Sequence, residues 1–588
     1  MKEEDRNRLH YEIGVVLRNS CGGLASDNKV FLCVDQLNRG QEMINGSEEV
    51  LQVVQTNHSA ASMALKACNF TAALRYAKTA LKLIEQDNEF ASSKSILSVM
   101  ASAAYACGHF EEASSAIDTI LRDEASLDEK FMFDVYDLKI TMLVSRQEGK
   151  LAFSTCLEVL RKLGEEISTT SASDAHVMEL QKRLRQISDK YGEITESDLL
   201  KMKEMTSPNH LRLMHFYNHL VFISYFLKNM KMVKECSCRL LELTLEHGVS
   251  KHSTTSLARY AMTLPTKEGY RIGKMAISLL QRFDATDQIP SVYLCFYGYI
   301  AIYIEPLQSC AEMLKRGFEI GLSIRDAATF HDGNQYIQKS LLSGMNLQLL
   351  KKESQYQLRL GKEHSQTTAM LYCTQLNDTI STLINKNALV GSGSERENIS
   401  TTPEYEDSVT FHNAMKSFWL GYYDRCCYHS ERGIAVSDIK QIKSIMLMFY
   451  NGISCFHSSK KVKSNRKLKN AVRNAIKVME EMKEESPWNY ANKLHLLEAE
   501  SYSSNGHSSL AIKSYNAAIE ASRLSRFVHE QGLSCELAAL HFKRMKDLNT
   551  SLTYFKEAKA CYEQWGAQVK VDAIAQQIDS IQSAIEKI

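Results

Sequence analysis

The sequence predicts an all-α protein, built as an α-solenoid in which antiparallel helix pairs stack into a superhelix. The chain has 588 residues but only 6 Pro and 26 Gly. Long stretches without proline favour helix, because a proline inside one costs about 3 kcal/mol. A weak repeat of helical spacing also recurs along the chain. At about 12 residues per helix plus turns, we expect on the order of 25 to 30 helices.

The repeat is clearest in NGHSSLAIKSYNAAI, residues 505–519. Gly506 is followed by Ala511 at +5, Tyr515 at +9 and Ala518 at +12. This is the tetratricopeptide (TPR) pattern, with a glycine turn followed by small and large residues on one helix face. Spacings of four and three form a single stripe on a helix, and two helices pack closely where small residues lie at their crossing. The pattern therefore predicts a TPR-like helix pair.

Four other segments match the same template in part, at residues 68–81, 107–121, 420–434 and 546–558. No copy is complete, but the shared phase predicts stacked pairs that are stabilised mainly by their neighbours. The matching residues, in chain order, are Cys68, Phe70, Ala73, Ala77, Ala80 and Leu81; Gly108, Phe110, Ala113, Ile117 and Leu121; Gly421, Tyr423, Cys426 and Ile434; and Leu548, Ser551, Phe555 and Ala558.

Polar segments without periodicity divide the predicted repeats. The clearest lies at 385–408, which is rich in Gly, Ser, Thr and charge, and shorter breaks lie at 163–176 and 205–210. Pro487 is expected to open a new helix at its first turn. We therefore expect N-terminal TPR-like repeats with a short lead-in hairpin over 1–204, middle helical repeats over 205–384, a flexible linker over 385–408 and C-terminal TPR-like repeats over 409–588.

Composition argues against several classes of protein. A net charge of +1 disfavours a nucleic-acid binder, which usually has a strong basic excess. The 15 Cys form no C-x-x-C pair, so no zinc site built on such pairs is expected. The start of the chain is charged where the apolar core of a signal peptide would begin. The longest apolar segment, 291–304, is too short to span a membrane and predicts a buried helix. We therefore expect a cytoplasmic protein with reduced thiols and no membrane span.

Two histidine motifs invite a chemical interpretation. His529 and Glu530 start an H-E pair, but a zinc protease motif needs a second histidine at 533, where Leu533 stands. We therefore expect this helix to pack into the stack, with His529 and Glu530 near its start. His215 and His219 are four residues apart in the apolar run 214–226. With no carboxylate or cysteine nearby in the sequence, they predict core or groove histidines and a poor metal site.

The remaining candidates predict no chemistry either. The glycine-rich segment 391–400 lacks the lysine of a phosphate-binding loop, and kinase and G-x-S-x-G signatures are absent. The charge run 460–485 predicts a solvated helix face, with a nucleic-acid or acidic-lipid contact as the alternative. Residues 400–402 are candidate phosphate acceptors. The sequence therefore predicts a protein that is not an enzyme, with no catalytic, cofactor-binding or metal residue and no cofactor.

Several segments together resemble one family, the long helical regions of large multidomain signalling proteins. In that family the region follows a STAND/AAA-type ATPase module, often precedes a sensor histidine kinase, and often shares its chain with an N-terminal serine/threonine kinase domain. The resemblance runs almost from end to end. It is carried by residues 8–17, 31–44, 60–84, 244–262, 268–283, 488–500, 527–542 and 560–571.

The ATPase and kinase signatures of that family are absent from this sequence, so its enzymatic activities do not carry over. The resemblance implies a non-catalytic scaffold that mediates protein–protein interaction in intracellular signalling. Its expected partners are proteins or peptides, with a STAND/AAA-type ATPase or a sensor kinase as candidates. The alternative is a regulatory fragment of a larger ATPase, protein kinase or histidine kinase, acting in cis or in trans with the missing modules. An enzyme with an unrecognised site is the third hypothesis.

Overall fold

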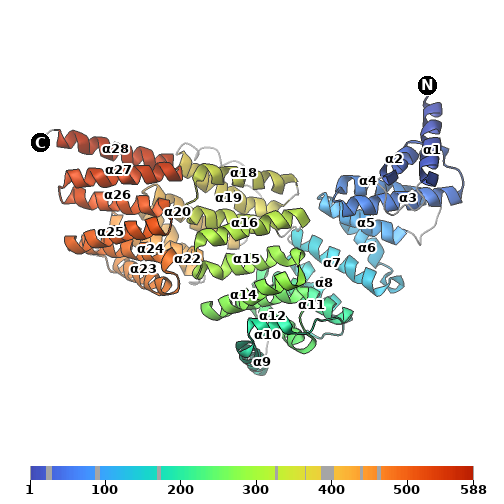
Figure 1. Cartoon of the computed structure of the whole chain (residues 1–588), viewed down its shortest axis with the longest axis horizontal. Coiled ribbons are helices and arrows are strands. Elements are labelled where there is room, and N and C mark those ends of the chain that lie inside the picture. Colours follow the sequence, from blue (N-terminus) through green and yellow to red (C-terminus); the bar gives the residue numbers. More distant parts are fainter. Residues whose placement is uncertain are drawn as a thin grey trace. The chain divides into compact units, whose positions relative to one another are not determined.

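The computed structural model describes residues 2–20, 29–85, 93–146, 148–167, 174–324, 329–363, 366–385, 403–436, 441–459 and 465–586. These residues form 28 α-helices and four short 3-10 helices (Figure 1). The described ranges contain one isolated parallel bridge, between Glu204 and Val249, and no named strand. The all-α class and the expected number of helices are therefore confirmed.

The chain divides into two compact units. Unit 1 comprises Met1–Ser188 and Met205–Leu243. Its helices are α1 (Glu3–Ser20), α2 (Lys29–Arg39), α3 (Ser47–Lys66), α4 (Phe70–Glu85), α5 (Ser93–Ala106), α6 (Phe110–Leu121), α7 (Glu129–Ser145), α8 (Gly149–Lys162), most of α9 (Asp174–Glu193), α11 (Pro208–Phe226) and most of α12 (Met230–His247).

Unit 2 comprises Asp189–Glu204 and Thr244–Ile588. Its helices are α10 (Glu196–Lys201), α13 (Lys251–Ala261), α14 (Thr266–Phe283), α15 (Ile289–Tyr299), α16 (Leu307–Ile324), α17 (Thr329–Leu342), α18 (Leu347–Glu363), α19 (Thr367–Ile384), α20 (Pro403–Trp419), α21 (Tyr423–Val436), α22 (Ile442–His457), α23 (Arg466–Glu485), α24 (Pro487–Asn505), α25 (Ser508–Leu524), α26 (Val528–Arg544), α27 (Leu548–Trp565) and α28 (Gln568–Ile585).

The predicted division of the chain into four segments stays a prediction. Residues 386–402 of the expected linker lie outside the described residues, and α20 begins at Pro403. In the expected loop at 163–176, residues 168–173 lie outside the described ranges and α9 begins at Asp174. The segment between α10 and α11 covers residues 202–207, so the last three residues of the expected break at 205–210 belong to α11. Pro487 is the first residue of α24, as the sequence predicts.

The two helices of six TPR-like pairs are joined by the same kind of turn, which also ends helices at Gly164, Asp284, Gly344, Arg526 and Gly566. In each turn one residue has a positive φ, and the N–H of the next residue donates to a carbonyl five positions earlier, as His507 does to Tyr502 at 2.9 Å. This is the Schellman ending of a helix. In the six TPR-like pairs the positive-φ residues are Cys68 (59°), Gly108 (77°), Lys228 (57°), Gly421 (77°), Gly506 (83°) and Lys546 (67°).

The residues after these turns are buried where the template expects them. In the clearest copy, Ala511, Tyr515 and Ala518 are at most 1% exposed. The +5 position is fully buried in all five copies that the sequence identified, at Ala73, Ala113, Cys426, Ala511 and Ser551. TPR-like stacked pairs are therefore confirmed by the contacts of the chain itself.

The sequence missed the sixth copy, in which α11 and α12 form a pair. Lys228 stands where glycine is typical, and the next template position is Val233 in place of a small residue. Val233, Ser237 and Leu240 are nevertheless 5%, 3% and 1% exposed, at the +5, +9 and +12 positions. The spacing of buried positions, and not residue identity, is what this copy retains.

The apolar segment 291–304 forms the last part of α15 and the 3-10 helix Ala301–Tyr303. Seven residues of α15 are buried, among them Phe296 at 0% exposure, so the expectation of a buried helix is confirmed. Among the described residues, no helix is long and apolar enough to cross a membrane.

The turn geometry predicts the effect of two opposite substitutions. A Cβ at Gly506 would meet no atom within 4 Å, so Gly506→Ala strains only the left-handed backbone and should cost about 1 kcal/mol of unfolding free energy. Lys546→Gly relieves the same strain and should gain about 0.5 kcal/mol after the entropy of the unfolded chain is included. All three tryptophans lie in unit 2, so urea unfolding followed by tryptophan fluorescence measures both changes. Equal effects of the two substitutions on the unfolding free energy would contradict the left-handed backbone assigned to both positions.

Candidate functional site

The first helix of each pair lies in an inner row. In unit 1, α3 contacts α5, α5 contacts α7, and α7 contacts α11. In unit 2, α20, α22, α24 and α26 contact one another in the same way. Contacts between successive second helices, such as α4 and α6, are sparse. One side of an inner helix packs on its own partner and two sides on its neighbours, so the fourth side is the inner face of the stack.

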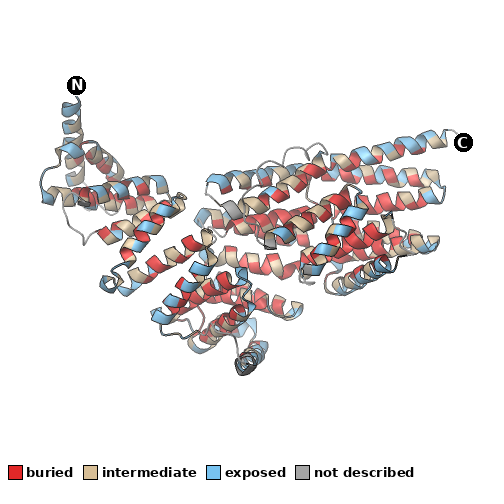
Figure 2. Cartoon of the chain, turned by 180° about the vertical axis from the view of Figure 1, so that it is seen from behind, coloured by how far each residue is buried: buried red, intermediate tan, exposed pale blue. Residues whose placement is uncertain are grey.

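The inner row of unit 2 is enclosed by its own chain. All residues of α22 from Ser444 to Cys455 are buried, and α24 and α26 are buried on nearly all sides (Figure 2). Asn489 of α24 donates to the carbonyls of Ile302 and Glu305, at 3.1 and 2.8 Å. Segments about 180 residues earlier thus cover this face, and the inner face of α24 offers no free concave surface.

His529 and Glu530 lie at the start of α26, as predicted, and both are buried. The Glu530 carboxylate accepts from Lys493 Nζ at 2.7 Å and from Asn492 Nδ2 at 2.5 Å. The Lys493 ammonium also lies 4.3 Å from the Phe527 ring centroid. Glu530 is therefore bound to a cation and an amide of the preceding inner helix, which gives it a structural role.

The His529 ring packs against two tryptophans that also contact each other. Its centroid is 5.6 Å from that of Trp419 and 5.1 Å from that of Trp565, and the two indole centroids are 4.8 Å apart, so the three rings form one cluster. The backbone turn at Gly344 packs closely against the ring, since a Cβ there would lie 2.4 Å from His529 Nδ1. Burial lowers the pKa of His529 to about 4, so the ring is neutral at pH 7.

Buried charges also link the other inner helices of this row. The Glu500 carboxylate of α24 lies 3.1 Å from His457 Nε2 of α22 and accepts from the Tyr515 hydroxyl. Glu536 of α26 binds Lys570 Nζ of α28 at 2.6 Å and accepts from the Tyr562 hydroxyl at 2.5 Å. Together with Lys493–Glu530, these contacts form a buried polar ladder through α22, α24, α26 and α28.

Unit 1 differs, because its inner helices keep a half-exposed polar stripe. The stripe residues recur at helical spacing, and hydroxyls predominate on α5. A hydrogen bond of 2.9 Å between Tyr105 of α5 and Ser145 of α7 joins two neighbouring helices on this side. We call this surface the unit-1 inner face; its residues are Gln55, His58, Ser59 and Ser62 on α3, Ser95, Ser98, Ser102 and Tyr105 on α5, Asp134, Asp137, Leu138 and Thr141 on α7, and Arg212, His215, His219 and Phe222 on α11.

The structure brings an aspartate to the predicted histidine pair. Asp137 of α7 faces α11, and its Oδ1 lies 2.8 Å from Nε2 of His215 and 2.8 Å from Nε2 of His219. The two imidazole centroids are 4.8 Å apart. The sequence correctly placed the two histidines on one face, but it missed Asp137, which lies 78 residues before His215.

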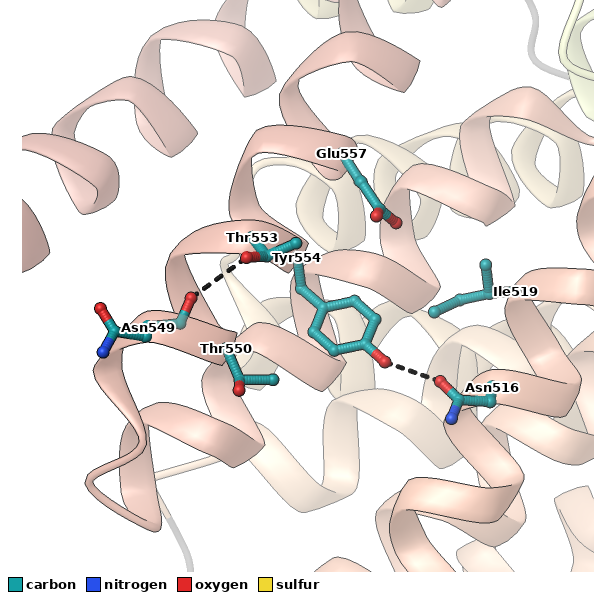
Figure 3. A pocket seen from close by; sticks show the side chains of 7 residues that line it. All are labelled: Asn516, Ile519, Asn549, Thr550, Thr553, Tyr554 and Glu557. Carbon is teal, nitrogen blue, oxygen red and sulfur yellow. Dashed lines mark hydrogen bonds between the residues drawn. The ribbon is translucent and has the colours of Figure 1, made fainter.

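An open hollow lies on the outer side of unit 2, between α25 and α27 (Figure 3). Tyr554 crosses it and donates to Asn516 Oδ1 at 2.7 Å. Its lining is mostly amide and hydroxyl groups, with Glu557 as the one titratable carboxylate, so the hollow brings together no acid–base pair. The lining residues are Asn516, Ile519, Asn549, Thr550, Thr553, Tyr554 and Glu557.

The charge run 460–485 forms α23 from Arg466 onward, and residues 460–464 lie outside the described ranges. One stripe of α23 is buried, and Lys467 points to solvent, where it pairs with Glu431 at 2.6 Å. The candidate phosphate acceptors at 400–402 and the glycine-rich segment 391–400 also lie outside the described residues.

No protein-family model matches the chain, and no curated protein matches it. Among solved structures, the crystal structure of yeast Tom70 is 10% identical over 91% of this chain and 99% of its own, with a TM-score of 0.17. A structure of Naa15/Naa10 bound to HypK-THB is 12% identical over 100% and 98%, also with a TM-score of 0.17. These scores are too low to support a shared fold, so the helical-repeat architecture rests on the helices of this chain.

The polar ladder predicts a strong dependence on both partners of one pair. Glu530→Gln or Lys493→Met leaves a buried charge without its partner and should lower the unfolding free energy of unit 2 by about 3–5 kcal/mol. The double substitution K493M/E530L removes both charges and should recover most of this loss. Urea unfolding followed by tryptophan fluorescence measures all three. Additive losses in the double variant would show that the pair does not act as a unit.

Acid should weaken unit 2 through its buried histidines. The folded-state pKa of His529 is lowered from about 6.5 to about 4, so the unfolded chain binds more protons between these values. The contribution of neutral His529 to the unfolding free energy is complete above pH 6.5 and is lost as the pH falls toward 4. His529→Gln should make the unfolding free energy less steep in this window. The slope should not vanish, because burial also lowers the pKa of His412 to about 3. An unchanged slope would contradict this role for His529.

Proposed function

We propose that the protein is a non-catalytic helical-repeat scaffold in intracellular signalling, located in the cytoplasm, that binds a segment of a protein partner on the unit-1 inner face. One observation carries this proposal. The inner row of unit 2 is filled by its own chain, whereas the inner helices of unit 1 keep a half-exposed stripe of polar side chains.

The chemistry of this stripe suits a peptide or a helix of another protein. Ser59, Ser62, Ser98 and Ser102 are small, so a backbone can approach α3 and α5 closely, and their hydroxyls can exchange hydrogen bonds with it. Phe222 of α11 adds a half-buried aromatic ring at the far end of the row. Inner faces of helical repeats present extended surfaces of this kind to their partners.

The buried titratable groups of unit 2 favour a structural role over catalysis. Lys493, Glu530, Glu536 and Lys570 are each bound to an opposite charge inside the stack. A catalytic group must contact a substrate, and these side chains are at most 12% exposed. Their arrangement supports a rigid scaffold.

A second proposal follows from the family resemblance in the sequence. In it, the chain acts as a regulatory fragment of a larger ATPase, protein kinase or histidine kinase, in cis or in trans with the missing modules. The partner would then be a STAND/AAA-type ATPase or a sensor kinase. Both proposals place the contact on a helical-repeat surface, and they differ in whether the partner carries a nucleotide-binding module.

The unit-1 inner face can be tested with a photo-crosslinker. A photoreactive phenylalanine analogue at Ser98 should crosslink, in cells, to one recurring partner segment, which peptide mass spectrometry identifies. The matched control carries the analogue at Thr553, which is exposed on the outer side of α27. A nucleotide-binding module in the captured partner would support the second proposal, and its absence would support the free scaffold.

Substitutions then test the contact with that purified partner. S98R/S102R fills the α5 stripe with bulk and charge and should weaken binding at least tenfold, while T553R should bind as the unmodified chain does. Circular dichroism confirms that each variant keeps its helices. Loss of binding in T553R alone would place the contact on the outer side of unit 2 and overturn the proposal.

A further inference from the structure

We propose that Asp137, His215 and His219 form a binding site for a divalent transition-metal ion of the zinc type, which clamps α7 to α11. The inference does not rest on the proposed function. Among the described residues, this is the one set of three or more His, Cys, Asp or Glu side chains whose ligand atoms lie close enough to share an ion, all within 4.8 Å of one another.

The local structure is that of a chelate. His215 and His219 are four residues apart on α11, so their side chains stack on one face and turn the same nitrogen, Nε2, to the same point. The carboxylate comes from α7, on the neighbouring repeat. Two imidazole nitrogens and one carboxylate oxygen make a three-ligand set, which leaves one position of a tetrahedral ion open to water or another donor.

The distances require only a small adjustment. With bonds of about 2.0–2.1 Å around a tetrahedral ion, neighbouring ligand atoms lie about 3.3 Å apart. The two oxygen–nitrogen distances are 2.8 Å, so each must open by about 0.5 Å, and the two Nε2 atoms, which lie within 4.8 Å of one another, must also come to about 3.3 Å. Rotation about the side-chain bonds of all three residues changes these distances.

The site is accessible and has a suitable charge. The side chains of Asp137, His215 and His219 are 39%, 34% and 25% exposed, so an ion can reach them from solvent. A neutral imidazole carries one proton, which can reside on either ring nitrogen. With that proton on Nδ1, Nε2 of each histidine offers its lone pair, and Asp137 supplies one negative charge. Imidazole ligands favour zinc, copper, iron or nickel over magnesium and calcium.

Cysteine thiolates are the main competitors for such an ion, and two cysteines in the core of unit 1 are too buried to act as ligands. Cys156 and Cys236 belong to the core cluster that also holds Phe216 of α11, and they are 0% and 1% exposed. Burial raises the pKa of both thiols well above the ordinary value, so neither supplies a thiolate at pH 7. A metal bound here should therefore show nitrogen and oxygen ligands and no sulfur.

The test uses the full chain, purified without a polyhistidine tag and treated with a chelator. Co²⁺ is titrated in and followed by visible absorption. The expected result is one Co²⁺ per chain with the d–d bands of a tetrahedral site, no thiolate charge-transfer band, and displacement by one equivalent of Zn²⁺. Zn²⁺ should also raise the melting temperature, and above the Kd the rise should grow with the logarithm of the free Zn²⁺ concentration.

Variants decide whether the three residues are the ligands. H219Q and D137N should each weaken Co²⁺ binding at least about 100-fold, because removing even an outer-shell group often costs 10- to 100-fold. The matched control is H495Q. His495 lies 3.1 Å from Glu498 on one helix turn, a pair with no third ligand among the described residues, and its loss should leave Co²⁺ binding unchanged.

Three results would overturn the proposal. They are the absence of stoichiometric Co²⁺ binding, a charge-transfer band that reports thiolate ligands, and full affinity retained in both H219Q and D137N. In the first case the cluster is a hydrogen-bonded pair of histidines on one carboxylate and nothing more. Circular dichroism of each variant confirms the fold, so a loss of binding reports the ligands and not unfolding.

Discussion

The stack in unit 2 depends on pairing the charges that it buries. Moving an ion out of water costs several kcal/mol, and only a close opposite charge with further hydrogen bonds offsets this. Lys493 with Glu530, and Glu536 with Lys570, meet both conditions at contacts of 2.7 and 2.6 Å. Each pair joins one inner helix to the next, so a shift of either helix along its axis would separate the charges. The polar ladder thereby fixes the register of the row as well as closing its inner face.

The turns that join the helices set the geometry within which such pairs can form. In each pair a residue in the left-handed conformation ends the first helix. The residue five positions later is buried, where the second helix packs against the first. Where the left-handed residue is glycine, as at Gly506, the turn is free of strain. Where it is Lys228 or Lys546, the chain accepts a cost of about 1–2 kcal/mol, which packing of the following helix must exceed. The repeat thus tolerates imperfect copies because packing, and not the turn alone, specifies the pair.

The two units are built from the same kind of helix pair, but their inner helices differ in how far they are buried. In unit 2 the inner helices are buried on nearly all sides, so their polar side chains bind one another. In unit 1 the inner helices keep water on one side, and their polar side chains are left for hydrogen bonds or for ligands from outside the chain. Asp137 with His215 and His219 shows this difference. These three groups share a solvent-accessible position on the unit-1 inner face.

Local spacing in the sequence determined the helices, their number and the buried positions of five repeats, because burial of one helix face repeats every three to four residues. It also placed His215 with His219 on one face, and Pro487 at the start of a helix. The tertiary structure alone decided which residues meet across helices. Lys493 lies 37 residues from Glu530, and Asp137 lies 78 from His215. These contacts within unit 2 and unit 1 depend on which helices pack together, and that follows from the summed packing of many helices, to which no short motif corresponds.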